Sequence, residues 1–265
     1  KLQQEFKLCH KIWIHVDGAW GGAALFSKKY RPLLLKGVHH ADSFTFNPHK
    51  LLGAPQQTTI FLTKHNHILM DSNATGAKYL FDKRKVGAEY DLGDASYTCG
   101  RRTDAIKFWA MWKYYGLKGL EQRVESKITV LSQLAHKIRQ HPSFLLVDEW
   151  PFNINFFYLP QRIRHRLQEL NNNDNNKNNK NNNSPTFPLD EINTKLPADI
   201  YKELTKITVQ LKIRLHKAGI MLIPYQPLDG VDADCFRIVL AGKKEFTNQD
   251  NQRILDLMQQ YGDDL

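Results

Sequence analysis

The sequence predicts an α/β fold in two parts, with an open sheet in the first half and a small α+β domain in the second. Three short apolar runs, Ile12–Val16, Ser43–Phe46 and Thr58–Thr63, have the length and composition of buried strands. More than two dozen residues separate the first two runs, enough for the crossover that parallel strands require. In the second half, apolar residues at helical spacing alternate with further strand-like runs.

The second half contains three helix patterns. The first begins near Asp104, the second ends at Gly219, a residue suited to a helix C-terminus, and Thr247 can cap the third with its hydroxyl. The apolar faces of the first two consist of Leu120, Val124, Ile128, Leu131 and Ile138, and of Ile200, Leu204, Ile207, Leu211 and Leu215. The strand candidates are Phe144–Val147, Ile154–Tyr158, Ile220–Ile223 and Phe236–Leu240.

The change from sheet pattern to long helix predicts two domains, residues 1–116 and 117–265. Within the second, Asn171–Asn183 has ten Asn among its thirteen residues. Such a segment has almost no apolar surface to bury, so it is predicted to be a disordered surface insertion. A prion-like interaction role is the alternative.

Composition restricts the classes of function. With 42% hydrophobic residues among 265 the chain can bury a sizeable core, but no apolar run reaches the about 20 residues of a membrane-spanning helix, so no membrane partner is expected. The net charge is +10, yet Lys and Arg are interleaved with acidic residues and no nucleic-acid-binding motif accompanies them. We therefore expect no nucleic-acid partner; attraction of acidic substrates is the functional alternative to a solvated basic surface.

Cysteine and histidine usage points to a reducing compartment without a bound metal. The three cysteines are widely spaced and odd in number, which predicts a cytoplasmic protein without a disulfide framework. The histidine groups His39–His40 and His65–His67 lack neighbouring Cys, Asp or Glu, so they are interpreted as loop residues. The chain begins with Lys1 and a charged stretch, which indicates a start within a longer protein.

Two charged residues are placed where a cofactor site would be. Lys50, in Asn47-Pro48-His49-Lys50, follows a strand candidate, and open α/β sheets bind ligands at the carboxyl ends of their strands. A partly buried lysine amine there can attack an aldehyde. Asp17 ends the earlier strand, where a protonated pyridine nitrogen would compensate its charge, and Ala19, Gly21 and Gly22 would let a flat ring approach the backbone. The alternatives are a surface lysine at a turn and a helix-capping aspartate.

Several motifs in order resemble one family. They are His15-Val16-Asp17-Gly18-Ala19-Trp20-Gly21-Gly22, Ala41-Asp42-Ser43 followed by Asn47-Pro48-His49-Lys50, Tyr79-Leu80-Phe81, Cys99-Gly100-Arg101-Arg102 through Trp109 and Trp112, Tyr225-Gln226-Pro227, Phe236-Arg237, and Tyr261-Gly262-Asp263-Asp264-Leu265. Together they resemble the group II pyridoxal-phosphate (PLP) amino-acid decarboxylases, in the branch that contains glutamate and cysteine sulfinate decarboxylases. The resemblance covers nearly the whole chain except the Asn-rich tract. It implies the aspartate aminotransferase fold (fold type I), with the end of the PLP-binding large domain in residues 1–116.

The resemblance also implies roles for individual residues. Lys50 would hold PLP covalently, Asp17 would pair with its pyridine nitrogen, and Ala19 would pack against the ring. His15, Asn47 and His49 would lie close to the cofactor. Tyr79 would cap the site from a mobile loop and supply a proton. Arg237 would bind the substrate carboxylate, and Gln57 would lie near the cofactor. The loop with Tyr79 reaches a partner subunit in glutamate decarboxylases, which implies a homodimer.

The motifs leave the substrate open and contain departures. Cysteine sulfinate is ranked first by a small margin, with glutamate and aspartate as alternatives. Gly18 stands where the family usually has Ala, Cys235 replaces an aromatic residue, and Gly242 ends a pair that in the family ends in Asn. The upstream part of the family, including a histidine stacked on the cofactor ring, is absent from this sequence. A truncated, non-catalytic remnant that keeps the fold and a dimerisation role is therefore the second hypothesis.

Overall fold

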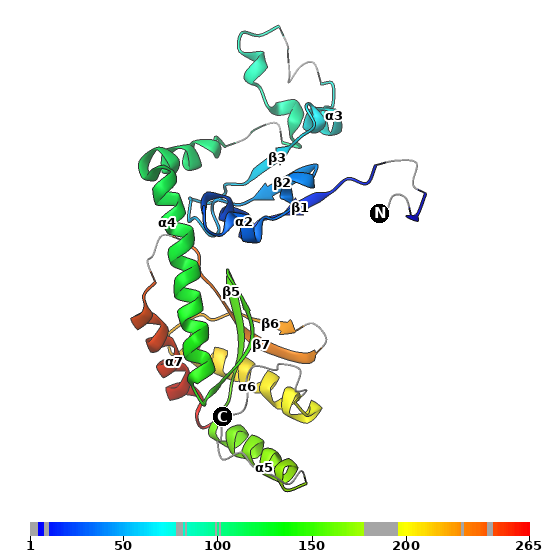
Figure 1. Cartoon of the computed structure of the whole chain (residues 1–265). Helices are drawn as coiled ribbons and strands as arrows, with labels where there is room; N and C mark the ends of the chain where they lie inside the picture. The colour runs from blue at the N-terminus through cyan, green and yellow to red at the C-terminus, as the bar shows by residue number, and fades with distance from the viewer. Residues whose placement is uncertain are drawn as a thin grey trace. The chain divides into compact units, whose positions relative to one another are not determined.

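The computed structural model describes residues 5–7, 11–77, 82, 84–98, 100, 102–177, 196–228, 231–242 and 246–265. It divides into two compact units, Lys1–Val124 and Glu125–Leu265. The boundary lies inside α4 (Ala105–Gln140), which has a kink at Gly116, where φ is +63° (Figure 1). The domain boundary expected after residue 116 stays a prediction; it coincides with the kink, eight residues before the division between the units.

The first unit contains a three-stranded sheet in the order β1-β2-β3. β1 (His15–Asp17) runs parallel to β2 (Ser43–Phe46), as expected, and β3 (Ile60–Thr63) is antiparallel to β2. The short elements around this sheet are the 3-10 helices η1 (Gly21–Phe26), η2 (Val38–His40), η3 (Ala88–Tyr90) and η4 (Gly93–Ala95), and the helices α2 (Arg31–Leu34) and α3 (Ile68–Asn73).

Aromatic rings build the core on one face of this sheet. Phe44 and Phe46 of β2 are buried, and the ring of Phe26 lies 6.1 Å from Phe46 and 6.0 Å from Phe108 of α4. Strand side chains alternate between faces, so Ser43 and Thr45 lie on the opposite face with their register partners in β1. The sheet thus has one packed aromatic face and one face that carries polar side chains together with Phe61 of β3.

The first apolar run does not form the buried strand that was expected. Residues 11–15 are exposed, and β1 covers only His15–Asp17. In the described part of the chain β1 pairs only with β2, so it is an edge strand of this sheet. The prediction of a buried strand over Ile12–Val16 is therefore wrong for the described residues: the strand is shorter than the apolar run, and Ile12, Trp13 and Ile14 are exposed.

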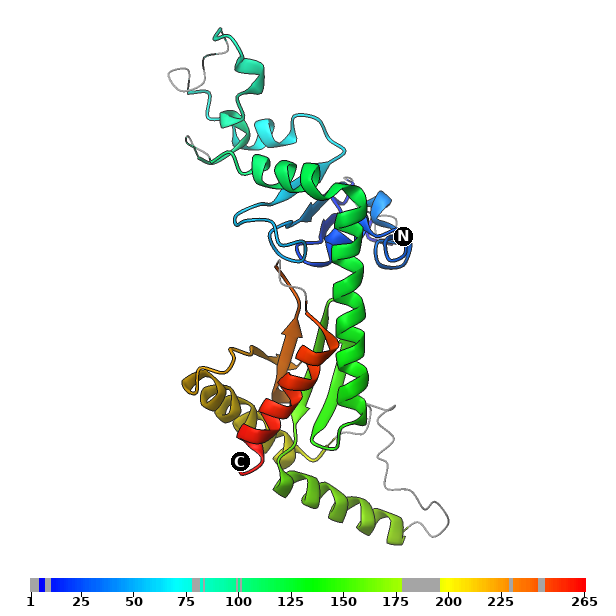
Figure 2. The ribbon, with the colours of Figure 1, turned by 90° about the vertical axis from the view of Figure 1, so that its left-hand side faces the viewer.

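The second unit is an antiparallel sheet packed with helices. The strand order is β4-β5-β7-β6, from β4 (Phe144–Trp150), β5 (Asn153–Tyr158), β6 (Tyr225–Leu228) and β7 (Val231–Val239). The helices are α5 (Gln161–Lys177), α6 (Ala198–Lys217), α7 (Asn248–Gly262) and the second part of α4. α7 runs beside α4 (Figure 2), where Asn251 Nδ2 donates to Val130 O at 2.9 Å.

The periodicity predictions agree with the core of this unit. The predicted apolar face of α6, from Ile200 to Leu215, is fully buried. Gly219 follows α6 with φ +67°, as a helix stop requires. Thr247 caps α7 by accepting the Asp250 N–H at 3.2 Å.

Two expectations in the second unit are wrong. Ile220–Ile223 is not a strand; β6 begins at Tyr225, and Ile223 packs into the core without joining the sheet. A four-residue apolar run has the same pattern whether or not it pairs. Helix α5 extends to Lys177 and so covers the first seven residues of the Asn-rich tract, because lengthening a formed helix costs less than starting one. Residues 178–183 of that tract lie outside the described residues.

Candidate functional site

The candidate site lies at the carboxyl ends of β1 and β2. Asp17 ends β1 and pairs in register with Thr45 of β2. Its side chain is exposed, and Oδ1 accepts the Ala19 N–H at 2.9 Å. The carboxylate was expected at a buried strand end; among the described residues it is exposed, with one backbone donor.

Backbone hydrogen bonds position Lys50 in a turn just beyond β2. The Asn47 N–H donates to Ala19 O at 3.2 Å, which joins the segment after β2 to the segment after β1. The Lys50 N–H donates to Asn47 O at 2.9 Å, and Arg123 Nη1 of α4 donates to Leu52 O at 3.3 Å. Lys50 is half-buried, and Leu51 and Leu52 after it are fully buried. The lysine is therefore held at the same sheet edge as Asp17.

The glycines after β1 allow close packing under the sheet. A Cβ added at Gly22 would lie 2.6 Å from the Cβ of Phe46, and one added at Gly18 would lie 2.9 Å from the Phe44 ring. The missing side chain of Gly22 thus accommodates the aromatic core, whereas the sequence suggested room for a flat ring. The same contact explains Gly18: the Phe44 ring fills the space that a larger residue would need.

Two buried polar atoms near this edge lack partners among the described residues. They are Oδ1 of Asn47 and Nε1 of Trp20. The side-chain amide of Asn47 therefore retains unused hydrogen-bonding capacity. A ligand bound at the strand ends can satisfy such atoms, which otherwise destabilise the fold.

His49 and Gln57 take part in a loop between β2 and β3. The Nδ1 atom of His49 lies 3.0 Å from the backbone nitrogen and 2.5 Å from the backbone oxygen of Thr58, so the His49 ring fixes the conformation of this loop. Gln57 next to it is exposed and lines an open cavity of about 1020 Å³ in the first unit. Asp17, Ala19, Asn47 and Lys50 do not line this cavity. Its wall is built by Thr58–Ile60, Tyr90–Gly93, Arg102–Ala105, Phe108, Trp109, Trp112 and Lys113.

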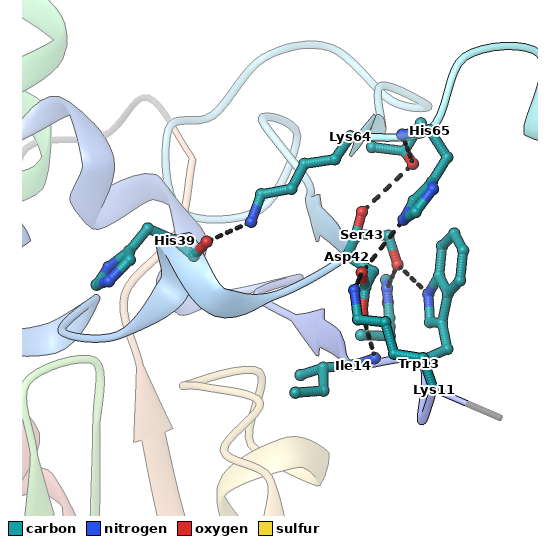
Figure 3. Close-up of polar contacts among 10 residues, drawn as sticks. Lys11, Trp13, Ile14, His39, Asp42, Ser43, Lys64 and His65 are labelled. Atoms are coloured by element: carbon teal, nitrogen blue, oxygen red, sulfur yellow. Dashed lines mark hydrogen bonds and ion pairs between the residues drawn. The ribbon is translucent and has the colours of Figure 1, made fainter. Parts of the chain in front are cut away.

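A polar cluster at the opposite end of the strands centres on Asp42 (Figure 3). The side chain of Asp42 is 2% exposed. Its Oδ1 forms an ion pair with Lys11 Nζ and lies 3.2 Å from His65 Nε2, and its Oδ2 accepts the Ile14 N–H at 3.0 Å. These donors, first the Lys11 ammonium, then the Ile14 N–H and His65, hold the pKa of the Asp42 carboxyl well below its ordinary value.

A second set of contacts adjoins this cluster on the sheet face that also bears Asp17. Trp13 Nε1 donates to Ser43 Oγ at 2.8 Å, and His15 Nδ1 lies 2.7 Å from the same oxygen. The Trp13 ring is 4.6 Å from the His65 ring, while Lys64 Nζ donates to His39 O (Figure 3).

This cluster was missed by sequence reasoning, which treated His65 as a loop residue. Asp42 lies 31 residues from Lys11 and 23 from His65. Nothing local in the sequence marks these three as partners. The only available signal was an aspartate at the start of a buried strand.

Two further expected site residues lie elsewhere in the chain. Tyr79 lies outside the described residues. Arg237 belongs to the second unit, on β7 opposite Asn155 of β5, and its Nε is buried without a partner among the described residues. Among those residues no group of three or more His, Cys, Asp or Glu side chains is arranged to hold a metal. No helix in the described part of the chain is long and apolar enough to cross a membrane.

Sequence comparison finds a conserved domain and similar curated proteins. Residues 2–158 match the family described as pyridoxal-dependent decarboxylase conserved domain. The chain is 34% identical over 259 residues to human cysteine sulfinic acid decarboxylase, covering 97% of this chain and 46% of that protein. It is also 34% identical over 260 residues to an acidic amino acid decarboxylase of Xenopus tropicalis, covering 97% of this chain and 45% of the relative. The chain thus spans less than half the length of the curated relatives it matches.

Solved structures share the fold. A crystal structure of mouse CSAD matches with a TM-score of 0.78 and 31% sequence identity, covering 100% of this chain and 48% of that one. A tryptophan decarboxylase of Catharanthus roseus in complex with L-tryptophan matches with a TM-score of 0.67 at 21% identity, covering 99% of this chain and 46% of that one. The second likeness concerns the fold alone. The expected fold class is confirmed.

Proposed function

Because the chain belongs to the pyridoxal-dependent decarboxylase family, we propose that it carries the PLP-binding lysine of an enzyme that decarboxylates an acidic L-amino acid. The observation that carries this proposal is the arrangement of Lys50 and Asp17. An amine and a carboxylate stand at the carboxyl ends of adjacent parallel strands, joined by the bond from Asn47 N–H to Ala19 O at 3.2 Å. Ligands of open α/β sheets bind at this edge.

The residues present fit PLP. An aldehyde needs an amine, which Lys50 offers, and a protonated pyridine nitrogen needs an anion, which the exposed carboxylate of Asp17 offers. The partnerless amide atom of Asn47 and the neighbouring ring of His49 add polar groups at the same edge. PLP, when bound, supplies an electron sink that stabilises the charge left on the α-carbon as carbon dioxide departs.

The chain's own residues would divide the remaining work. Lys50 anchors the cofactor and Asp17 accepts a hydrogen bond from the ring nitrogen, while Ala19 packs beside the ring. His15, Asn47 and His49 would lie close to the cofactor, with Asn47 and His49 contributing polar groups for its phosphate. Gln57 also lies near the cofactor in this proposal.

Arg237 is the proposed carboxylate-binding residue. Its buried Nε has no partner among the described residues, and a planar guanidinium can bind a carboxylate through two parallel hydrogen bonds. Tyr79 is proposed as the proton donor after carbon dioxide leaves.

Cysteine sulfinate is the substrate we rank first. The proteins named cysteine sulfinic acid decarboxylase and acidic amino acid decarboxylase among the relatives support an acidic substrate. Glutamate and aspartate are the alternatives, because each also carries a second acidic group. We further propose that residues 1–116 end the PLP-binding domain and 117–265 form the small domain, and that the enzyme is a cytoplasmic homodimer.

Borohydride trapping tests the lysine. The protein, expressed from its full reading frame, is incubated with PLP, reduced, digested and mapped by mass spectrometry. We expect a pyridoxyl adduct on the peptide with Lys50, lost in Lys50→Ala and retained in the matched control Lys36→Ala, which removes an exposed lysine. Adducts spread over many lysines, or none in a folded protein, would refute the proposal and favour the non-catalytic remnant.

Carbon dioxide release tests the substrate. The same preparation is supplied with cysteine sulfinate, glutamate or aspartate at equal concentration. Faster release from cysteine sulfinate supports the ranking. Faster release from either of the others reverses it, and release from none of them, with the Lys50 adduct present, rejects an acidic substrate.

A further inference from the structure

The hydroxyl of Ser43 has two side-chain partners in the described part of the chain. Trp13 Nε1 lies 2.8 Å from Ser43 Oγ, and His15 Nδ1 lies 2.7 Å from it. His15 and Ser43 are register partners across β1 and β2. Ser43 is 3% exposed, so water has little access to its oxygen.

The hydrogens in this group can be assigned by counting donors and acceptors. An indole Nε1 only donates, so Ser43 Oγ accepts from Trp13. A hydroxyl has one hydrogen, and the remaining partner of Ser43 is His15 Nδ1. If Nδ1 carried its own hydrogen, the buried Ser43 hydroxyl would have no acceptor among the described residues, an arrangement that proteins avoid. His15 Nδ1 is therefore the acceptor, and the neutral ring carries its hydrogen on Nε2.

The indole of Trp13, which donates to Ser43, is itself held in place by His65 and Asp42. The Trp13 ring lies 4.6 Å from the ring of His65, and His65 Nε2 lies 3.2 Å from Asp42 Oδ1 (Figure 3). Asp42 Oδ2 also accepts the N–H of Ile14, the residue after Trp13, at 3.0 Å. Both the indole ring and its backbone neighbour are thus tied to the buried carboxylate of Asp42.

We propose that Ser43, oriented by Trp13, is a positioning residue that holds His15 as the Nε2–H tautomer, so that His15 presents a hydrogen-bond donor on the sheet face that bears Asp17. His15 and Asp17 are two residues apart on β1 and share that face, about 7 Å from each other. The consequence for cofactor binding rests on the proposed function, in which this face receives PLP. The assignment of the His15 tautomer does not depend on the proposed function.

Nuclear magnetic resonance reads the tautomer directly. A long-range proton–nitrogen correlation spectrum of the nitrogen-15 histidine-labelled protein is recorded at a pH of about 8, where an ordinary histidine is neutral. His15 is assigned by its absence from the spectrum of His15→Gln. We expect a hydrogen on Nε2 in the wild-type protein and in Ser43→Thr, which keeps the hydroxyl. In Ser43→Ala and Trp13→Phe we expect a mixture of both tautomers, with His136 and His216 as unchanged internal references.

Trp13→Phe is the sharper variant because it does not touch His15. Without the indole N–H, water can enter beside Ser43 Oγ and accept the hydroxyl hydrogen. Ser43 Oγ can then accept from His15 Nδ1 as well as donate to it, so the constraint is lost. The Trp13 side chain is 43% exposed, which makes a folding failure from this change less of a concern than from a buried one. A hydrogen on His15 Nδ1 in the wild type, or one unchanged tautomer in both variants, overturns the proposal.

Fluorescence titration with PLP separates this inference from the proposed function. We expect Ser43→Ala to bind PLP about two- to tenfold more weakly than wild type, the loss of one hydrogen bond. If wild type binds PLP and the tautomer shifts without any change in affinity, the role in cofactor binding is refuted. If wild type does not bind PLP while the tautomer shifts as expected, the proposed function fails and the positioning of His15 stands.

Discussion

Gly22→Ala tests whether the backbone after β1 packs on the aromatic core as the structure shows. The added Cβ would lie 2.6 Å from the Cβ of Phe46 and 2.8 Å from the Phe44 ring. Carbon atoms in contact are ordinarily about 3.5–4.0 Å apart, so an overlap of about 1 Å must be relieved. The Phe44 ring can rotate, but the Cβ of Phe46 is fixed to the backbone of β2, so the strand or η1 must move.

Overpacking of this size lowers the free energy of unfolding by about 1–3 kcal/mol. Since Phe46 immediately precedes Asn47, the same displacement reaches the turn that holds Lys50. We therefore expect Gly22→Ala to destabilise the first unit and also to weaken PLP binding.

Urea unfolding followed by tryptophan fluorescence measures the effect in the correct unit. Four of the five tryptophans precede residue 125, and the fifth, Trp150, is 60% exposed. In a Trp150→Phe background the fluorescence therefore reports the first unit alone. Gly100→Ala is the matched control, because a Cβ at Gly100 meets nothing within 4 Å. If Gly22→Ala unfolds within about 0.5 kcal/mol of the control, the close packing under the strand is refuted.

Three further changes probe the polar cluster and the second unit. Because the pKa of Asp42 is lowered in the folded protein, its carboxylate stabilises the fold above the ordinary aspartate pKa of about 3.9, and this stabilisation is lost as the pH falls below that value. In a series of thermal melts at different pH, Asp42→Asn should therefore reduce the fall in melting temperature at acid pH. The control Asp71→Asn, at an exposed aspartate, should leave that fall unchanged. Tyr158→Phe removes a buried hydroxyl that donates to Asp263 Oδ1 at 2.8 Å, and should cost about 0.5–1.5 kcal/mol in urea titrations followed by circular dichroism; no change would show that this bond adds nothing. Thr247→Ala removes the cap of α7 and should cost about 1 kcal/mol in the same assay, whereas Thr247→Ser should retain most of it.

The sequence by itself determined the features that depend on neighbouring residues. The apolar face of α6 is the one its spacing predicts, because a helix brings residues three and four apart to one side whatever surrounds it. The C-terminus of α6 before Gly219 likewise follows from local backbone preference, and the N-terminus of α7 after Thr247 follows from capping. The family, too, was evident from short motifs in order, and the matched domain confirms it.

Only the tertiary structure decided which distant segments meet. Whether Ile220–Ile223 pairs as a strand, whether β3 is antiparallel to β2, and whether Asp17 is covered all depend on neighbours that a linear pattern does not specify. Asp42 shows the reason most clearly, since its partners lie 31 and 23 residues away. A helix or a cap is stabilised by contacts within one or two turns, whereas a buried charge is stabilised by donors that arrive only when separate strands are brought together.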